Sequence, residues 1–143
     1  MKRARTLGMG RNRVEDLQVY HKAAAAADAV FAITEKPVFN RDPELRAQMR
    51  SSSGRITSHL QEGSGQSTDR HYAHYVSIAR GSSKEMKGHL RRALGYGFIS
   101  EEEYATHWQM FDEIAAMLTG LKRHLDEDDR KDRGVTSSRS PPD

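Results

Sequence analysis

Apolar residues recur at spacings of three and four along most of the chain, which is the period of one face of an α-helix. The first such segment runs from about Asp16 to Thr34, and Pro37 ends the pattern. Its predicted core stripe consists of Leu17, Tyr20, Ala24, Ala27, Phe31 and Thr34. We expect this stripe to face the interior of a helical bundle.

Further apolar residues lie off the stripes. A second face of the first segment contains Val14, Val19, Ala23, Val30 and Ile33, and Val38, Phe39, Phe98 and Ile99 fall in predicted loops. A monomeric bundle needs one apolar face per helix, so we interpret this extra surface as favouring oligomerisation. The alternative is a wide stripe that wraps a small core.

Three more segments carry start and stop signals for helices. The second opens with Asp42 as N-cap and closes at Gly63-Ser64-Gly65, and the third runs from about Asp69 to Leu94 before a terminating Gly95. The fourth opens with Ser100 and Glu103 in a capping box. We find no alternating strand pattern. Because short linkers make successive helices antiparallel neighbours, the sequence predicts an all-α, up-down-up-down four-helix bundle.

The predicted organisation is a basic flexible N-terminal arm over residues 1–14, the bundle over residues 15–125, and a tail over residues 126–143. The tail is rich in charge and has no apolar periodicity, so we expect it to be disordered. The 143 residues suit one domain, and the absence of cysteine excludes disulfides and thiolate chemistry. No segment is long and apolar enough to span a bilayer, and the expected location is the cytoplasm.

Charge is distributed unevenly along the chain. Residues 1–100 carry 17 Lys and Arg against 9 Asp and Glu, whereas residues 101–143 carry 6 against 11. The asymmetry suggests a polyanion-binding face or head-to-tail self-association, although solubility alone would also explain it.

Cations share one face of the third predicted helix. Arg80, Lys84, Lys87 and Arg91 are spaced by four, three and four residues, and Arg92 lies beside them. Arg46 and Arg50 repeat the spacing on the second helix. These seven residues are the candidate nucleic-acid-binding set, because a line of cations suits a phosphate backbone. The alternative is a solvated face balanced by acids of a neighbouring subunit, such as Glu101–Glu103. No aromatic residue is interleaved on the stripe, so base stacking is not indicated.

Small residues interrupt the third helix. Gly81, Ser82, Ser83 and Gly88 oppose helix propensity, each glycine by ~1 kcal/mol relative to alanine. We expect a second helix to approach closely there, inside the bundle or across a subunit contact. Glu62, Arg80 and Glu85 are hypothesised to form a polar network at that contact, and three unrelated surface charges are the alternative.

No constellation of catalytic or metal-ligating residues stands out. None of the seven histidines has a glutamate three residues before it, as a helical di-iron site requires. The segment from Gly63 to Thr68 lacks the lysine of a phosphate loop, and no Gly-x-Ser-x-Gly motif is present. We therefore expect no enzymatic activity, no cofactor and no bound metal.

Several motifs match a known family. They are Ile56-x-x-His59-Leu60-x-Glu62-Gly63, Tyr75-x-x-Ile78-Ala79-Arg80-Gly81-Ser82-Ser83-x-Glu85, and Ser100-Glu101-Glu102-Glu103-Tyr104. Over about residues 15–125 the chain resembles a bacterial four-helix-bundle family named after proteins encoded in intervening sequences of large-subunit ribosomal RNA genes. The resemblance gives Glu62, Gly63, Arg80, Gly81, Ser82 and Glu85 family-matched positions, which form the candidate structural motif. It implies a homo-oligomer, a pentameric ring, without known enzymatic chemistry.

The chain is also similar, in fold and charge, to accessory proteins of diversity-generating retroelements. Those are basic pentameric bundles that bind a reverse transcriptase and nucleic acid. The expected partners are therefore other copies of the chain, and RNA, DNA or a nucleic-acid enzyme such as a reverse transcriptase, without a membrane. The sequence favours a ring with a basic, nucleic-acid-binding surface, and the alternative is a protein-interaction scaffold with no nucleic-acid role.

Overall fold

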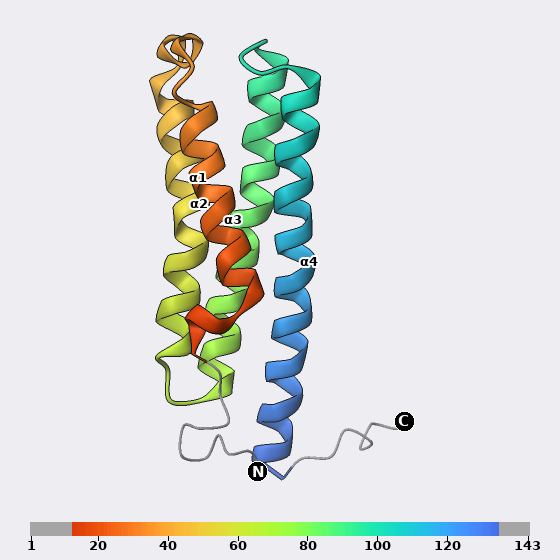
Figure 1. Ribbon diagram of the computed structural model, residues 1–143. Helices are drawn as coiled ribbons and strands as arrows, with labels where there is room; N and C mark the ends of the chain where they lie inside the picture. Colours follow the sequence, from red (N-terminus) through yellow and green to blue (C-terminus); the bar gives the residue numbers. More distant parts are fainter. Residues whose placement is uncertain (1–12, 135–143) are drawn as a thin grey trace.

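The computed structural model describes residues 13–134 and contains four α-helices in that range. They are α1 (Gln18–Ile33), α2 (Pro43–Ser64), α3 (Asp69–Gly95) and α4 (Glu101–Asp132), which alternate in direction around a common core (Figure 1). Two short 3-10 segments, η2 (Val14–Asp16) and η3 (Pro37–Arg41), precede α1 and α2. The predicted all-α antiparallel four-helix bundle is confirmed.

Contacts between side chains define the antiparallel register of α3 and α4. Arg80 contacts Thr119 at 3.2 Å, and Lys87 contacts Asp112 at 2.8 Å. Seven residues forward along α3 therefore correspond to seven residues backward along α4. α1 has 16 residues against 32 in α4, so it lies beside only the first part of that longer helix (Figure 1).

The helix starts follow the predicted capping signals. Asp42 accepts a hydrogen bond from the Leu45 amide at 3.0 Å. Ser100 accepts one from the Glu103 amide at 3.0 Å, while the Glu103 carboxylate accepts one from the Ser100 amide at 2.8 Å. Each contact satisfies an amide at a helix N-terminus that has no partner inside its helix.

The two faces of α1 are reversed relative to the prediction. The core contains Val19, Ala23, Val30 and Ile33, which we had assigned to the second face. Of the predicted stripe only Thr34 is buried, and Phe31 is 53% exposed. Both faces of α1 are apolar, and the face that meets α2 and α4 is the one that becomes buried.

The loop residues expected to be exposed are also largely internal. Phe39, Phe98 and Ile99 are buried, and the rings of Phe39 and Phe98 contact each other with their centroids 5.1 Å apart. The use of this apolar surface as an argument for oligomerisation was therefore wrong, and the wide stripe around a small core is the correct alternative. Phe31, Ile78 and Tyr96 are the large hydrophobic residues that remain exposed in residues 13–134.

The predicted tail is partly helical. α4 continues to Asp132, seven residues into the segment 126–143 that we expected to be disordered. Ion pairs four residues apart join Lys122 to Asp126 at 2.7 Å and Arg133 to Asp129 at 3.4 Å. Such pairs support a helix that has no apolar stripe, which explains why the apolar periodicity did not predict this part of α4.

At the N-terminal end, Val14 is buried and is not part of a flexible arm. The rest of the predicted arm and tail, residues 1–12 and 135–143, lies outside the described residues.

Candidate nucleic-acid interface

Four predicted cations lie along the edge of α3 that borders α4. Arg80 and Lys87 both contact α4, and Lys84 and Arg91 follow them at helical spacing on the same edge. We call this line, together with the α4 side chains opposite it, the α3–α4 seam. The shared face predicted from the sequence is therefore present, although it borders a neighbouring helix.

Three of these cations have no carboxylate partner in the part of the chain that the structure describes. Arg80 donates to the neutral hydroxyl of Thr119 at 3.2 Å. Lys84 and Arg91 are exposed and form no hydrogen bond or ion pair within residues 13–134. Their charges remain available to an external anion.

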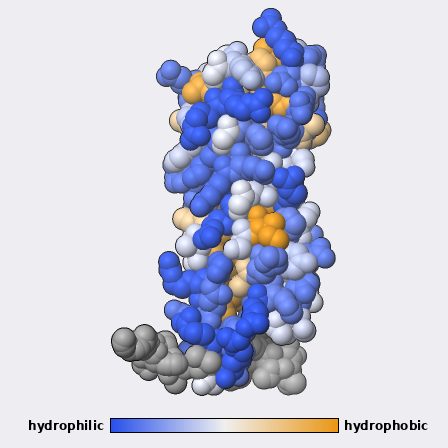
Figure 2. Space-filling view, turned by 180° about the vertical axis from the view of Figure 1, so that it is seen from behind, coloured by the Kyte–Doolittle hydropathy of each residue, from blue (hydrophilic) through white to orange (hydrophobic). Residues whose placement is uncertain are grey.

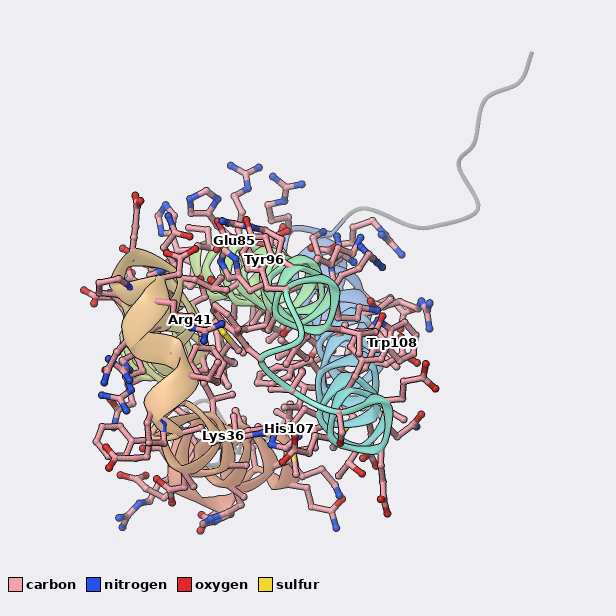
Figure 3. All side chains as sticks on the ribbon, turned by 90° about the horizontal axis from the view of Figure 1, so that it is seen from above. Lys36, Arg41, Glu85, Tyr96, His107 and Trp108 are labelled. Atoms are coloured by element: carbon pink, nitrogen blue, oxygen red, sulfur yellow. The ribbon has the colours of Figure 1, made fainter. Side chains whose placement is uncertain are left out.

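Lys87 is held more firmly. Its ammonium nitrogen lies 2.8 Å from Asp112 and 4.6 Å from the centre of the Trp108 ring, and its side chain is only 19% exposed. The indole nitrogen of Trp108 is buried and has no hydrogen-bond partner within the described chain. Figure 3 shows Trp108 on the α4 side of the bundle. An aromatic residue therefore does accompany the cations, which the sequence pattern of α3 alone could not reveal, but Lys87 occupies one face of its ring.

Arg46 and Arg50, also predicted to bind nucleic acid, instead contact the C-terminal end of α1. Arg46 donates from Nε to the backbone oxygen of Thr34 at 2.9 Å. Arg50 donates to the Thr34 hydroxyl at 2.9 Å and to the Phe31 carbonyl at 3.4 Å. These contacts satisfy backbone and side-chain acceptors where α1 ends, and the positive charges suit the negative end of its dipole.

The contacts of Arg50 and Arg92 extend to acids and rings. The Arg50 guanidinium lies 3.9 Å from the centre of the Phe31 ring and 3.2 Å from Glu35. Arg92 lies 3.8 Å from Asp42 and donates to the Tyr96 hydroxyl at 3.5 Å. We define Arg46, Arg50 and Arg92 as the upper arginine cluster, and each of its members has partners inside the chain.

The seam widens into a hollow of about 310 Å³ beside the second half of α4. Its lining residues are Arg80, Thr119, Lys122, Arg123, Asp126, Glu127 and Arg130. Sequence reasoning missed the contribution of α4, because Lys122, Arg123 and Arg130 lie in or next to a segment assigned to the acidic tail. Arg123 and Arg130 are spaced by seven residues, which indicates a shared helix face, and this signal was available in the sequence.

A family model for the 23S rRNA-intervening sequence protein matches residues 15–120, which cover α1, α2, α3 and the first part of α4. The chain belongs to this family. No curated protein matches the chain. None of the helices that the structure describes in residues 13–134 is long and apolar enough to cross a membrane.

The charged residues of the candidate structural motif, Glu62, Arg80 and Glu85, do not contact one another in the structure. Glu85 lies 2.7 Å from Arg55 and accepts from Ser52 at 3.1 Å, whereas Arg80 contacts Thr119. Glu62 is exposed. The hypothesised network of Glu62, Arg80 and Glu85 is therefore not formed within the chain, because the three side chains leave different sides of α2 and α3.

The glycines of the motif differ from one another. A Cβ atom on Gly63 would lie 2.8 Å from Tyr75 Cβ, so α2 and α3 meet too closely there for a larger residue. A Cβ on Gly81 or Gly88 would meet nothing within 4 Å. The expected close approach inside the bundle is therefore wrong for Gly81 and Gly88, and a contact across subunits stays a prediction. Ser82 is buried.

One histidine of this family member has a shifted pKa. Burial lowers the pKa of His89, and this effect outweighs the opposing influence of Glu85 one turn earlier on α3. Arg92 and Arg55 add to the lowering. His89 is therefore neutral near pH 7 and adds no positive charge to α3.

Proposed function

We propose that this protein is a non-enzymatic, cytoplasmic homo-oligomer that binds nucleic acid, or a nucleoprotein partner, through the α3–α4 seam. The observation that carries the proposal is the set of cations that lack a carboxylate partner within residues 13–134. They are Arg80, Lys84, Arg91, Arg123 and Arg130. Uncompensated cations along a seam favour a polyanion as ligand.

The length of the seam suits a nucleic-acid backbone. Arg91 lies eleven residues from Arg80 along α3, and Arg130 lies eleven residues beyond Thr119 along α4. Because Arg80 and Thr119 are in contact, the cations extend over about 33 Å at 1.5 Å per helical residue. Contacts of this kind position phosphates without reading bases, so we expect binding that depends little on sequence and falls steeply with salt.

Self-association is supported by the outward face of α3. Gly81 and Gly88 weaken an isolated helix by ~1 kcal/mol each, yet nothing in the described chain approaches them. Ile78, on the same side of the helix, is 36% exposed. A second subunit packed closely on this face would explain why glycine, and not a larger residue, is found at both positions. The family resemblance implies a pentamer, and the face lies beside the seam, so a ring would bring the seams of several subunits together.

A protein-interaction scaffold is the second candidate. Phe31 and Tyr96 are each more than half exposed, at 53% and 54%, and aromatic residues are enriched where proteins bind one another. The face seen in Figure 2 is mainly hydrophilic with isolated hydrophobic patches, so a broad apolar contact is not favoured on that face.

Light scattering tests both parts of the proposal. The mass of the protein is measured alone and with a generic single-stranded RNA, at low and at high salt. A ring that takes up RNA at low salt and releases it at high salt supports the proposal. A monomer at all concentrations contradicts self-association. A ring that ignores RNA at every salt concentration leaves the scaffold candidate and contradicts nucleic-acid binding.

A further inference from the structure

We infer that the hollow at the lower end of the seam is a binding site for a single phosphate group. The hollow lies between the middle of α3 and the second half of α4, drawn in blue in Figure 1. The inference deepens the proposed function, and it rests on that function only for the source of the phosphate, a nucleic-acid strand or a free phosphate ester.

Arginines from both helices line the hollow. Arg80 projects from α3, and Arg123 and Arg130 lie seven residues apart on one face of α4. Guanidinium groups offer planar pairs of N–H donors that match phosphate oxygens, so arginine is better suited than lysine to hold a phosphate in a fixed orientation. Thr119 accepts a hydrogen bond from Arg80 at 3.2 Å, which holds that guanidinium at the wall of the hollow.

The carboxylates of the hollow do not cancel its charge. Asp126 lies 2.7 Å from the Lys122 ammonium and is thereby paired, and Glu127 is the other acid in the lining. Four cationic groups against two carboxylates give the lining a net charge of +2. This charge complements a phosphate monoester, which carries about −1.5 to −2 at pH 7, and it also favours a phosphodiester group of a strand.

The upper seam lacks these properties. Lys87 is paired with Asp112 there, and the cations without partners, Lys84 and Arg91, do not line the hollow. A single cation on an open surface contributes long-range attraction that salt screens, whereas arginines from two helices around one hollow give an anion several partners. The hollow is therefore the position on the seam where a phosphate is held, and the upper seam serves to attract it.

Side-chain NMR of the arginines tests the site directly. The Nε–Hε resonances of the full-length protein are recorded while inorganic phosphate is added at constant ionic strength, with chloride as the reference anion. The Arg80 resonance is assigned from Arg80→Lys. We expect saturable shifts of Arg80, Arg123 and Arg130, and no saturable shift of Arg41, an exposed arginine of η3 at the opposite end of the bundle.

Variants of the exposed side of the hollow keep the test independent of folding. Arg123→Gln with Arg130→Gln leaves the Arg80–Thr119 contact in place, and we expect phosphate to bind about 10- to 100-fold more weakly. Arg13→Gln with Arg41→Gln removes the same charge from exposed positions before α1 and α2, and should leave the affinity unchanged. An equal loss in both double variants, or no saturable shift of Arg80 in the parent protein, overturns the inference.

A second titration with a short single-stranded RNA identifies the source of the phosphate. If RNA shifts the same three arginines and competes with inorganic phosphate, the ligand of the hollow is the strand. If phosphate binds the hollow and RNA does not, the inference stands with a free phosphate ester as ligand, and the proposed function fails. If RNA binds the protein without shifting Arg80, Arg123 or Arg130, the proposed function stands and the hollow is excluded as its phosphate site.

Discussion

Two groups of arginines differ in what surrounds them, although the sequence gives them the same appearance. In the upper arginine cluster, Arg46 and Arg50 donate to groups at the end of α1, and Arg92 contacts Asp42 and Tyr96. Along the seam, Arg80 has only a neutral hydroxyl, and Arg91 has no partner within residues 13–134. Arg46 and Arg50 are spaced by four residues on α2, and the seam cations repeat at intervals of four, three and four on α3. The surrounding acceptors decide whether such a repeat stabilises the fold or stays available to a ligand.

The comparison predicts that the upper cluster governs stability. Arg46→Ala with Arg50→Ala should lower the free energy of unfolding by about 3 kcal/mol, because several acceptors at the end of α1 lose charged donors. Urea unfolding followed by circular dichroism measures this change. At temperatures where the variant stays folded, its affinity for RNA should equal that of the parent. A stable variant with weakened RNA binding would mean that the upper cluster belongs to the interface.

The outward face of α3 sharpens the comparison next to the seam. Gly81→Gln with Gly88→Gln should raise helix stability by about 1–2 kcal/mol, since glutamine is the better helix former. If a second subunit packs on this face, the same variant loses its assembled mass in light scattering. Gly120→Gln, another open helical position, is the matched control. A double variant that is more stable and still fully assembled would exclude this face from the subunit contact.

Lys87 stands between the two groups, since it lies on the seam but is paired. Lys87→Met keeps the aliphatic stem and removes the charge, and we expect the unfolding free energy to fall by about 1 kcal/mol through loss of the contacts to Asp112 and Trp108. The emission of Trp108, the single tryptophan, should change as well. If Lys87→Met weakened RNA binding as much as Lys84→Met does, Lys87 would contribute to RNA binding and not only to the stability of the fold.

The smallest expected effect concerns Glu103, at the same end of the bundle as the upper cluster. The backbone amide of Ser100 and the ammonium of Lys36 lower the pKa of Glu103 below its ordinary value of 4.5. A lowered pKa in the folded state stabilises the protein above the unfolded pKa, and this stabilisation is lost as the pH falls through the folded value. Glu103→Gln should therefore cost about 0.5 kcal/mol at pH 7 and less at pH 3, as urea unfolding at the two pH values would show. An equal cost at both values would assign the effect to shape rather than charge.

Local signals in the sequence predicted much of the fold. The N-caps Asp42 and Ser100 depend on residues three positions away, so their partners are visible in the sequence itself. The face of α1 could not be chosen in this way, because both faces of an alanine-rich helix are apolar and only its neighbours decide which one is buried.

The candidate site was predicted only in part. The shared edge of Arg80, Lys84, Lys87 and Arg91 follows from helical spacing within α3. Pairing between elements does not, so the capping role of Arg46 and the contact of Lys87 with Trp108 required the structure. The hollow required the register of α3 against α4, which brings Arg80 beside Arg123 and Arg130 across more than forty residues of sequence.

The salt dependence of RNA binding tests the central claim most directly. The double variant Lys84→Glu, Arg91→Glu is compared with Arg13→Glu, Arg41→Glu, which changes the net charge equally with exposed arginines that precede α1 and α2, away from the seam. If the seam binds phosphates, the slope of log affinity against log salt falls by about two in the seam variant and hardly changes in the control, and the affinity at low salt falls at least about tenfold. Equal slopes and equal affinities in the two variants would contradict the account, because net charge alone would then explain the binding.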